Sequence, residues 1–184
     1  GVSVVNALAE WLEVKVNSKN EIHFQRYQRG LSSEPVKVIG ETDIKGTHIR
    51  FKPDSTIFET LEFSYDILSQ RLRELAFLNK GVKIIFSDER LAEPKIRIFQ
   101  FEGGVKSFVE YLNKTKKPLH PVPVYFEAVK EDVVVELALQ YNDGYSETVF
   151  TFVNNINTRE GGTHLIGFKA ALTRVFNEFL KKSK

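Results

Sequence analysis

The chain has 184 residues, 42% hydrophobic and 27% charged, with a formal net charge of +2 at pH 7. This composition is typical of a soluble globular protein with one or two domains, and it excludes a strongly basic surface overall. The lack of cysteine excludes disulfides and thiolate chemistry, and no signal peptide or uncharged membrane-spanning run is visible.

The first third of the chain predicts a short helix followed by an antiparallel sheet. Val5, Leu8 and Leu12 recur at helical spacing, so we expect a helix over residues 1–12. Strand-like runs follow at residues 12–16, 21–27 and 47–51. The turn signals between them are Asn20, Gly30 and the pair Lys45-Gly46.

The middle of the chain predicts two helices around a pair of strands. Ser64 is placed to cap a helix that ends at Asn79-Lys80-Gly81, with strands at 82–86 and 95–101 and a second helix opened by Gly103-Gly104. The expected buried stripe of the first helix is Leu68, Leu72 and Leu75, and its expected solvated residues are Arg71 and Arg73. The expected face of the second helix is Val105, Phe108, Val109 and Leu112.

Residues 114–123 are the best candidate for a linker. They hold three lysines and three prolines without apolar periodicity, and solvated hinge lysines are the simplest interpretation of Lys114, Lys116 and Lys117. Alternating strands are expected after it, with Asn142-Asp143-Gly144 as a hairpin turn and a third strand over 147–153.

The stretch 154–164 connects that third strand to a long amphipathic helix beginning at Thr163. Gly161 and Gly162 permit a tight backbone turn there. We expect the helix to pack an apolar face on the preceding sheet. That face is Leu165, Phe168, Leu172, Val175, Phe176 and Phe179.

The string Asn-Asn-Ile-Asn-Thr-x-Glu-Gly-Gly-Thr-His at 154–164 resembles the signature of the DNA gyrase B family, which belongs to the bacterial type II topoisomerases. Further segments are similar to the same family. They are residues 1–8, 40–43, 46–47, 50–51, 71–79, 101–104 and 108–113.

The resemblance implies an α+β fold, with the second half of a GHKL ATPase sandwich at residues 1–117 and the start of an S5-like transducer domain at 118–184. It implies a cytoplasmic protein that binds ATP and Mg²⁺ and acts on double-stranded DNA, with no membrane partner. Its implied protein partners are the gyrase A subunit, and a second B subunit in an ATP-dependent dimer. The catalytic glutamate and the magnesium-binding asparagine of the family lie upstream of Gly1. Since the chain also lacks methionine, we expect a fragment that does not hydrolyse ATP alone.

The resemblance also implies nucleotide-binding residues, each of which has a plainer structural interpretation. Gly1 matches the last glycine of the phosphate-binding lid, or is only a free terminus. Val2 and Ile49 match the adenine pocket, or are core. Thr47 matches the threonine that holds adenine, or is a strand residue beside a turn, while Ser3 lies where helix amides favour an anion.

No catalytic or metal-binding residue is expected in this chain. The histidines His23, His48, His120 and His164 lack ligand-like spacing, so His164 is interpreted as structural. Two alternatives stay open from the sequence: the matching subunit of topoisomerase IV, and a non-enzymatic S5-like interaction module.

Overall fold

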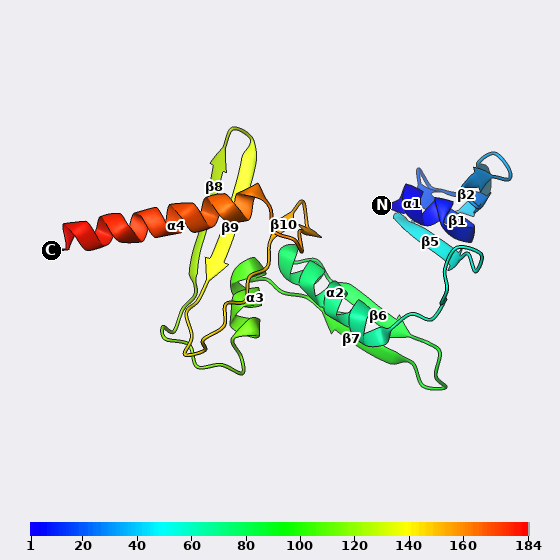
Figure 1. The fold of residues 1–184 in the computed structure, drawn as a ribbon. Helices are drawn as coiled ribbons and strands as arrows, with labels where there is room; N and C mark the ends of the chain where they lie inside the picture. The colour runs from blue at the N-terminus through cyan, green and yellow to red at the C-terminus, as the bar shows by residue number, and fades with distance from the viewer. Residues whose placement is uncertain (184) are drawn as a thin grey trace. The chain divides into compact units, whose positions relative to one another are not determined.

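The computed structural model describes residues 1–183, which include two compact units, Gly1–Ser64 and the unit that begins at Tyr65. Figure 1 shows the path of the chain through both. Each unit has helices and strands in separate stretches, so the predicted α+β class is confirmed. The boundary between these compact units lies after Ser64, not after residue 117. The predicted domain boundary after residue 117 stays a prediction.

The first unit is one short helix and an antiparallel sheet. The sheet has the strand order β3-β2-β1-β5, and β4 pairs with β2. All pairings are antiparallel, as predicted. The bounds are α1 Val2–Ala7, β1 Ala9–Ser18, β2 Glu21–Gln28, β3 Leu31–Ser32, β4 Lys37–Glu41 and β5 Gly46–Pro53.

The helix predicted over residues 1–12 is too long. α1 stops at Ala7, and β1 begins at Ala9, where the chain gains pairing partners on both sides. Leu12 lies inside that central strand and is almost fully buried. Its helical spacing from Val5 and Leu8 was therefore coincidental, because two rows of strand hydrogen bonds outweigh one extra helical turn.

A buried carboxylate joins the residue that follows β2 to the segment that follows β5. Asp54 is 1% exposed. It accepts hydrogen bonds from Arg29 Nε at 2.6 Å and from the backbone N and Oγ1 of Thr56 at 2.9 and 2.7 Å. The hydrogen bond from Arg29, followed by those from Thr56, lowers the pKa of Asp54 to about 2.

This carboxylate predicts that the first unit loses stability in acid. Because the pKa of Asp54 is depressed from 3.8 to about 2 in the folded chain, its stabilisation is complete above about pH 4 and is lost as pH falls through 2. Fluorescence of Trp11, the single tryptophan, follows unfolding of this unit. Asp54→Asn should be less stable at neutral pH and should show a flatter decline between pH 4 and 2; an unchanged decline contradicts this role.

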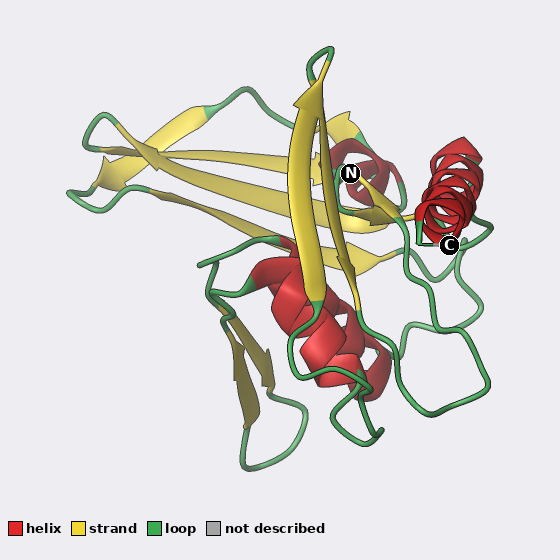
Figure 2. Cartoon of the chain, turned by 90° about the vertical axis from the view of Figure 1, so that its left-hand side faces the viewer, coloured by secondary structure: helices red, strands yellow, loops and turns green. Residues whose placement is uncertain are grey.

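The second unit contains two longer helices, three hairpins and the C-terminal helix. Figure 2 shows β8 and β9 as a long two-stranded hairpin. The bounds are α2 Tyr65–Leu78, β6 Ile84–Asp88, β7 Lys95–Phe99, α3 Gly104–Leu112, β8 Val124–Lys130, β9 Val133–Leu139, β10 Phe152–Val153, β11 Ile156–Asn157 and α4 Thr163–Lys182. The predicted positions of α2, the β6–β7 pair, α3 and α4 are confirmed.

Aromatic rings form the core between α2 and α3. Phe77 is 2% exposed, and its ring centroid lies 3.6 Å from that of Phe101 and 5.2 Å from that of Phe108. The predicted leucine stripe of α2 is wrong. Its buried residues are Ser69, Glu74, Ala76 and Phe77.

The two arginines of α2 are not simply solvated, contrary to expectation. Arg71 pairs with the buried Glu74, and the guanidinium of Arg73 lies over the rings of Phe99 and Tyr111. Arg71 thus neutralises a buried carboxylate, and Arg73 covers aromatic surface.

The turn and strand predicted after β9 are also wrong. β9 pairs with β8 through a turn at Glu131 and Asp132, whose φ angles are 50° and 65°. Among the described residues, no hairpin across 142–144 pairs β9 with a strand at 147–153. Asn142 instead directs its side chain to Asn113 and to the amide of Gly144. Only Phe152–Val153 of the expected third strand pairs, with Ile156–Asn157.

α4 buries less of its apolar face than predicted. Leu165, Phe168 and Leu172 are half-buried, whereas Val175, Phe176 and Phe179 are exposed, and none of its described residues is fully buried. Figure 1 shows the C-terminal half of the helix extending away from the other elements of its unit. Within residues 1–183, no helix combines the length and apolar character needed to cross a bilayer.

Candidate functional site

Two predicted nucleotide-binding residues share one face of the first sheet. Thr47 lies opposite Val16, and Ile49 lies opposite Val14, in the antiparallel register of β1 and β5. Residues directly opposite each other point to the same side of a sheet. Leu12 belongs to this side and is buried, so the covered face of the sheet is the one that carries Thr47 and Ile49.

This face is apolar but open where the two residues lie. Ile49 is 40% exposed, and Phe51, the next residue on the same face, is exposed to a similar degree. Thr47 is exposed as well, and its hydroxyl has no hydrogen-bond partner among the described residues. The arrangement offers a flat apolar wall with one free donor and acceptor, which suits a heteroaromatic ring.

The other predicted residues lie at the start of α1. Gly1 is its N-cap, and the amides of Val4 and Val5 are already bonded to the carbonyl of Gly1. The amides of Val2 and Ser3 therefore stay free, as first-turn amides of a helix do. A Cβ built on Gly1 meets nothing within 4 Å, so the helix start is open to a ligand. α1 contacts β1, which pairs with β5 in the sheet.

One further residue of this unit was missed from the sequence. Asn6 Oδ1 is buried and has no hydrogen-bond partner. A buried amide oxygen without a donor is costly, which indicates a partner outside the described residues. No sequence pattern marks Asn6, because an asparagine on a short helix looks like any exposed polar residue. The residues present thus fit a nucleotide, and no group of three metal-ligating side chains occurs in the described part of the chain.

The stretch 154–164 is a compact turn in the second unit, held by side-chain hydrogen bonds. Asn155 donates to Asn79 Oδ1 at 2.9 Å, at the end of α2. His164 Nε2 lies 3.2 Å from Thr158 Oγ1, which in turn bonds Thr151. Gly161 and Gly162 have φ angles of 80° and 153°. These contacts match the structural interpretation of His164.

A charged cluster links the end of α2 to the β8–β9 hairpin. Lys80 Nζ lies 3.0 Å from Glu136 Oε1 and 3.1 Å from Tyr125 OH, and Tyr125 donates to Glu136 at 3.0 Å. The Glu136 carboxylate, through its hydrogen bond, raises the pKa of Lys80 above its usual value. Lys80 therefore stays charged, and the cluster fastens the hairpin to the helix.

The fold is similar to solved gyrase structures. The 43K ATPase domain of Thermus thermophilus gyrase B, solved in complex with an aminocoumarin, matches with a TM-score of 0.82 and 38% identity over 98% of this chain and 50% of that one. The B-subunit of the DNA gyrase from Myxococcus xanthus matches with a TM-score of 0.81 and 27% identity over 93% of this chain and 50% of that one. These matches confirm the predicted α+β fold as that of gyrase B ATPase-domain structures.

The sequence is also similar to DNA gyrase B proteins. The DNA gyrase B protein of Bacillus mycoides is 52% identical over the whole chain, and that of Clostridium acetobutylicum is 56% identical over 99% of it. The chain spans 45% and 28% of these two relatives. The family model for DNA gyrase B matches residues 104–184. These names favour gyrase over topoisomerase IV and over an isolated S5-like module, and the chain therefore belongs, over its whole length, to the DNA gyrase B family.

Proposed function

We propose that this chain is a part of the ATP-binding B subunit of DNA gyrase, which couples ATP hydrolysis to negative supercoiling of DNA. The observation that carries the proposal is the match of the whole chain, at 52% identity, to a gyrase B protein. In that protein the chain supplies one wall of the nucleotide site and the start of the transducer. Its partners are double-stranded DNA, the gyrase A subunit, and a second B subunit, in the cytoplasm.

Different residues of the first unit bind different parts of the nucleotide. Ile49 and Val2 offer apolar surface to the adenine, and the hydroxyl of Thr47 bonds its polar edge, directly or through water. The free amides at the start of α1 face the phosphate end. ATP, bound with Mg²⁺, supplies the free energy of hydrolysis. The residues of this chain position the ATP.

A change at Thr47 tests the nucleotide site. In the full-length protein, Thr47→Val removes the hydroxyl at nearly constant volume. The loss of one hydrogen bond of about 0.5–1.5 kcal/mol should weaken ATP binding by a few-fold to about tenfold. Isothermal titration with a non-hydrolysable ATP analogue measures it.

Two matched variants sharpen this test. Thr47→Ser keeps the hydroxyl and should bind the analogue as the wild type does. His48→Ala changes the neighbouring residue, whose side chain is on the opposite face of β5, and should also leave affinity unchanged. Wild-type affinity in Thr47→Val would show that Thr47 does not contact the nucleotide.

A further inference from the structure

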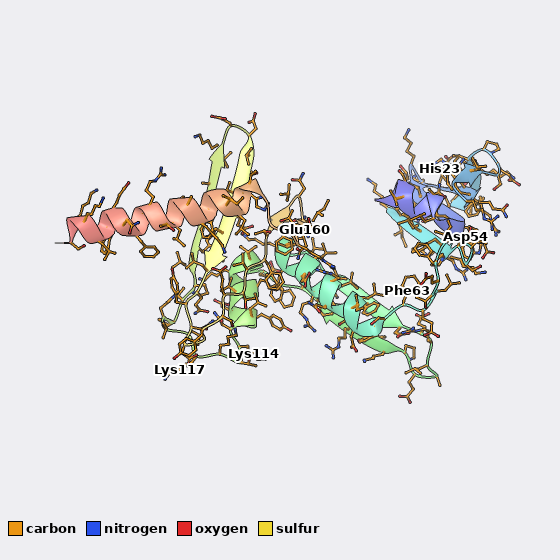
Figure 3. All side chains as sticks on the ribbon, viewed as in Figure 1. His23, Asp54, Phe63, Lys114, Lys117 and Glu160 are labelled. Atoms are coloured by element: carbon orange, nitrogen blue, oxygen red, sulfur yellow. The ribbon has the colours of Figure 1, made fainter. Side chains whose placement is uncertain are left out.

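The loop that follows α3 carries an uncompensated positive charge. Lys114, Lys116 and Lys117, here called the lysine loop, are all exposed. Among residues 1–183, no carboxylate forms an ion pair with any of them, in contrast to Lys80 and Lys169. Lys83 and Lys130 of this unit are unpaired as well, but each is a single lysine, whereas the loop gathers three. Figure 3 labels Lys114 and Lys117 on this loop. Three unpaired charges in four residues form a local cationic surface.

Hydrogen bonds hold the segment around the lysine loop in place. The interpretation of these residues as hinge lysines between two domains stays a prediction. Asn113, at the start of the loop, is 8% exposed and uses both ends of its amide. Its Nδ2 donates to Gln140 at 2.9 Å, and its Oδ1 accepts from Asn142 at 2.9 Å.

Backbone hydrogen bonds hold the rest of the loop against the same segment. The amide of Lys116 bonds the carbonyl of Asn113 at 2.9 Å, and the amide of Asp143 bonds the carbonyl of Lys117 at 3.1 Å. His120 continues this network, because its Nε2 accepts from the amide of Tyr141 at 3.0 Å. The backbone is thus ordered before any ligand binds, which lowers the entropy lost on binding.

We propose that the lysine loop is a docking surface for the sugar-phosphate backbone of duplex DNA. The argument is charge complementarity: separate lysines act as point charges and suit a polyanion with repeated phosphates better than one chelated anion. Asp143 is the acidic residue bonded to the loop through its backbone, and its single charge leaves the loop cationic. The proposal rests on the proposed function, which makes DNA the polyanion at hand.

Salt-dependent binding of the 184-residue chain to a fluorescent duplex tests this surface. The test variant is Lys114→Gln/Lys116→Gln/Lys117→Gln. The matched control, Lys45→Gln/Lys83→Gln/Lys130→Gln, removes three exposed and unpaired lysines elsewhere in the described chain. Since each phosphate contact adds about 0.9 to the slope of log affinity against log salt, the test variant should lose about 2.7 from that slope.

The control should keep most of the wild-type slope. Equal losses of slope in both variants would overturn the proposal, because net charge alone would then explain binding. A wild-type chain that binds no duplex in about 50 mM salt would overturn it as well. In a competition experiment, polyglutamate that displaces the labelled duplex as effectively as unlabelled DNA, and does so through these lysines, would assign the surface to an acidic protein instead. Nucleotide plays no part in this assay, so a failure at Thr47 and a failure at the lysine loop are distinguishable.

Discussion

Replacing Phe77 with alanine is expected to lower the free energy of unfolding of the second unit by about 3–5 kcal/mol, the usual loss for a buried phenylalanine. Phe77 is 2% exposed and stacks on Phe101 and Phe108. Truncating it leaves a cavity between these two rings, and rigid rings fill such a cavity poorly. The measurement is denaturant unfolding of the whole chain, monitored through hydrogen exchange of the α2 and α3 amides. These amides report the free energy of the second unit separately from that of the first.

Phe176→Ala is the matched control, because this side chain on α4 is 48% exposed. It should change the same free energy by less than about 0.5 kcal/mol, as exposed substitutions usually do. A loss at Phe176 as large as that at Phe77 would show that the face of α4 is covered in solution and that the aromatic core is not centred on Phe77.

The second large effect is expected at the glycine turn before α4. Gly162 has φ 153° and ψ 178°, a region nearly confined to glycine, and a Cβ there would lie 2.8 Å from the His164 ring. Gly162→Val should therefore cost on the order of 1–3 kcal/mol. Gly161→Val should act in the same direction, since its φ is 80° and its Cβ would meet Leu165 at 3.2 Å.

Gly167 provides the control for this turn. It lies within α4, and a Cβ there meets nothing within 4 Å. Gly167→Ala should be neutral or should stabilise the helix by up to about 1 kcal/mol. In the full-length protein we expect Gly162→Val also to lower the DNA supercoiled per ATP hydrolysed. Wild-type stability in Gly162→Val would contradict the backbone argument, and wild-type coupling would leave the turn only a structural role.

Local patterns in the sequence predicted the positions of α2, α3, α4 and the β6–β7 pair well. α2 begins directly after Ser64 and ends before Asn79, and α4 begins at Thr163, because caps and glycines act within a few residues. An antiparallel sheet in the first unit was predicted from strand-like runs separated by turn residues, and the structure adds that β1 pairs with both β2 and β5. Such signals need no knowledge of distant contacts.

The errors arose where distant residues decide the structure. Asn142-Asp143-Gly144 has the composition of a hairpin turn, but the side chain of Asn142 is held by Asn113. The turn between β8 and β9, Glu131-Asp132, contains no glycine, and it lies between two alternating runs that were predicted as successive strands. The pairing of β8 with β9 imposes the positive φ angles there. The buried face of α2 is likewise set by the aromatic residues packed around it.

The candidate site came from the resemblance rather than from chemistry visible in the sequence. Thr47 and Ile49 look like ordinary strand residues, and only their matching positions in the family single them out. The structure adds that they share a face of the sheet and that Asn6 carries an unsatisfied oxygen on α1. Sequence periodicity alone predicts none of these relations.

The most direct test is a supercoiling assay with the full-length protein that contains this chain, combined with the A subunit of the same gyrase. We predict that the pair converts relaxed circular DNA to the negatively supercoiled form when ATP is present and not when ATP is omitted. Decatenation and relaxation without negative supercoiling would instead identify a topoisomerase IV-like enzyme and contradict the central claim.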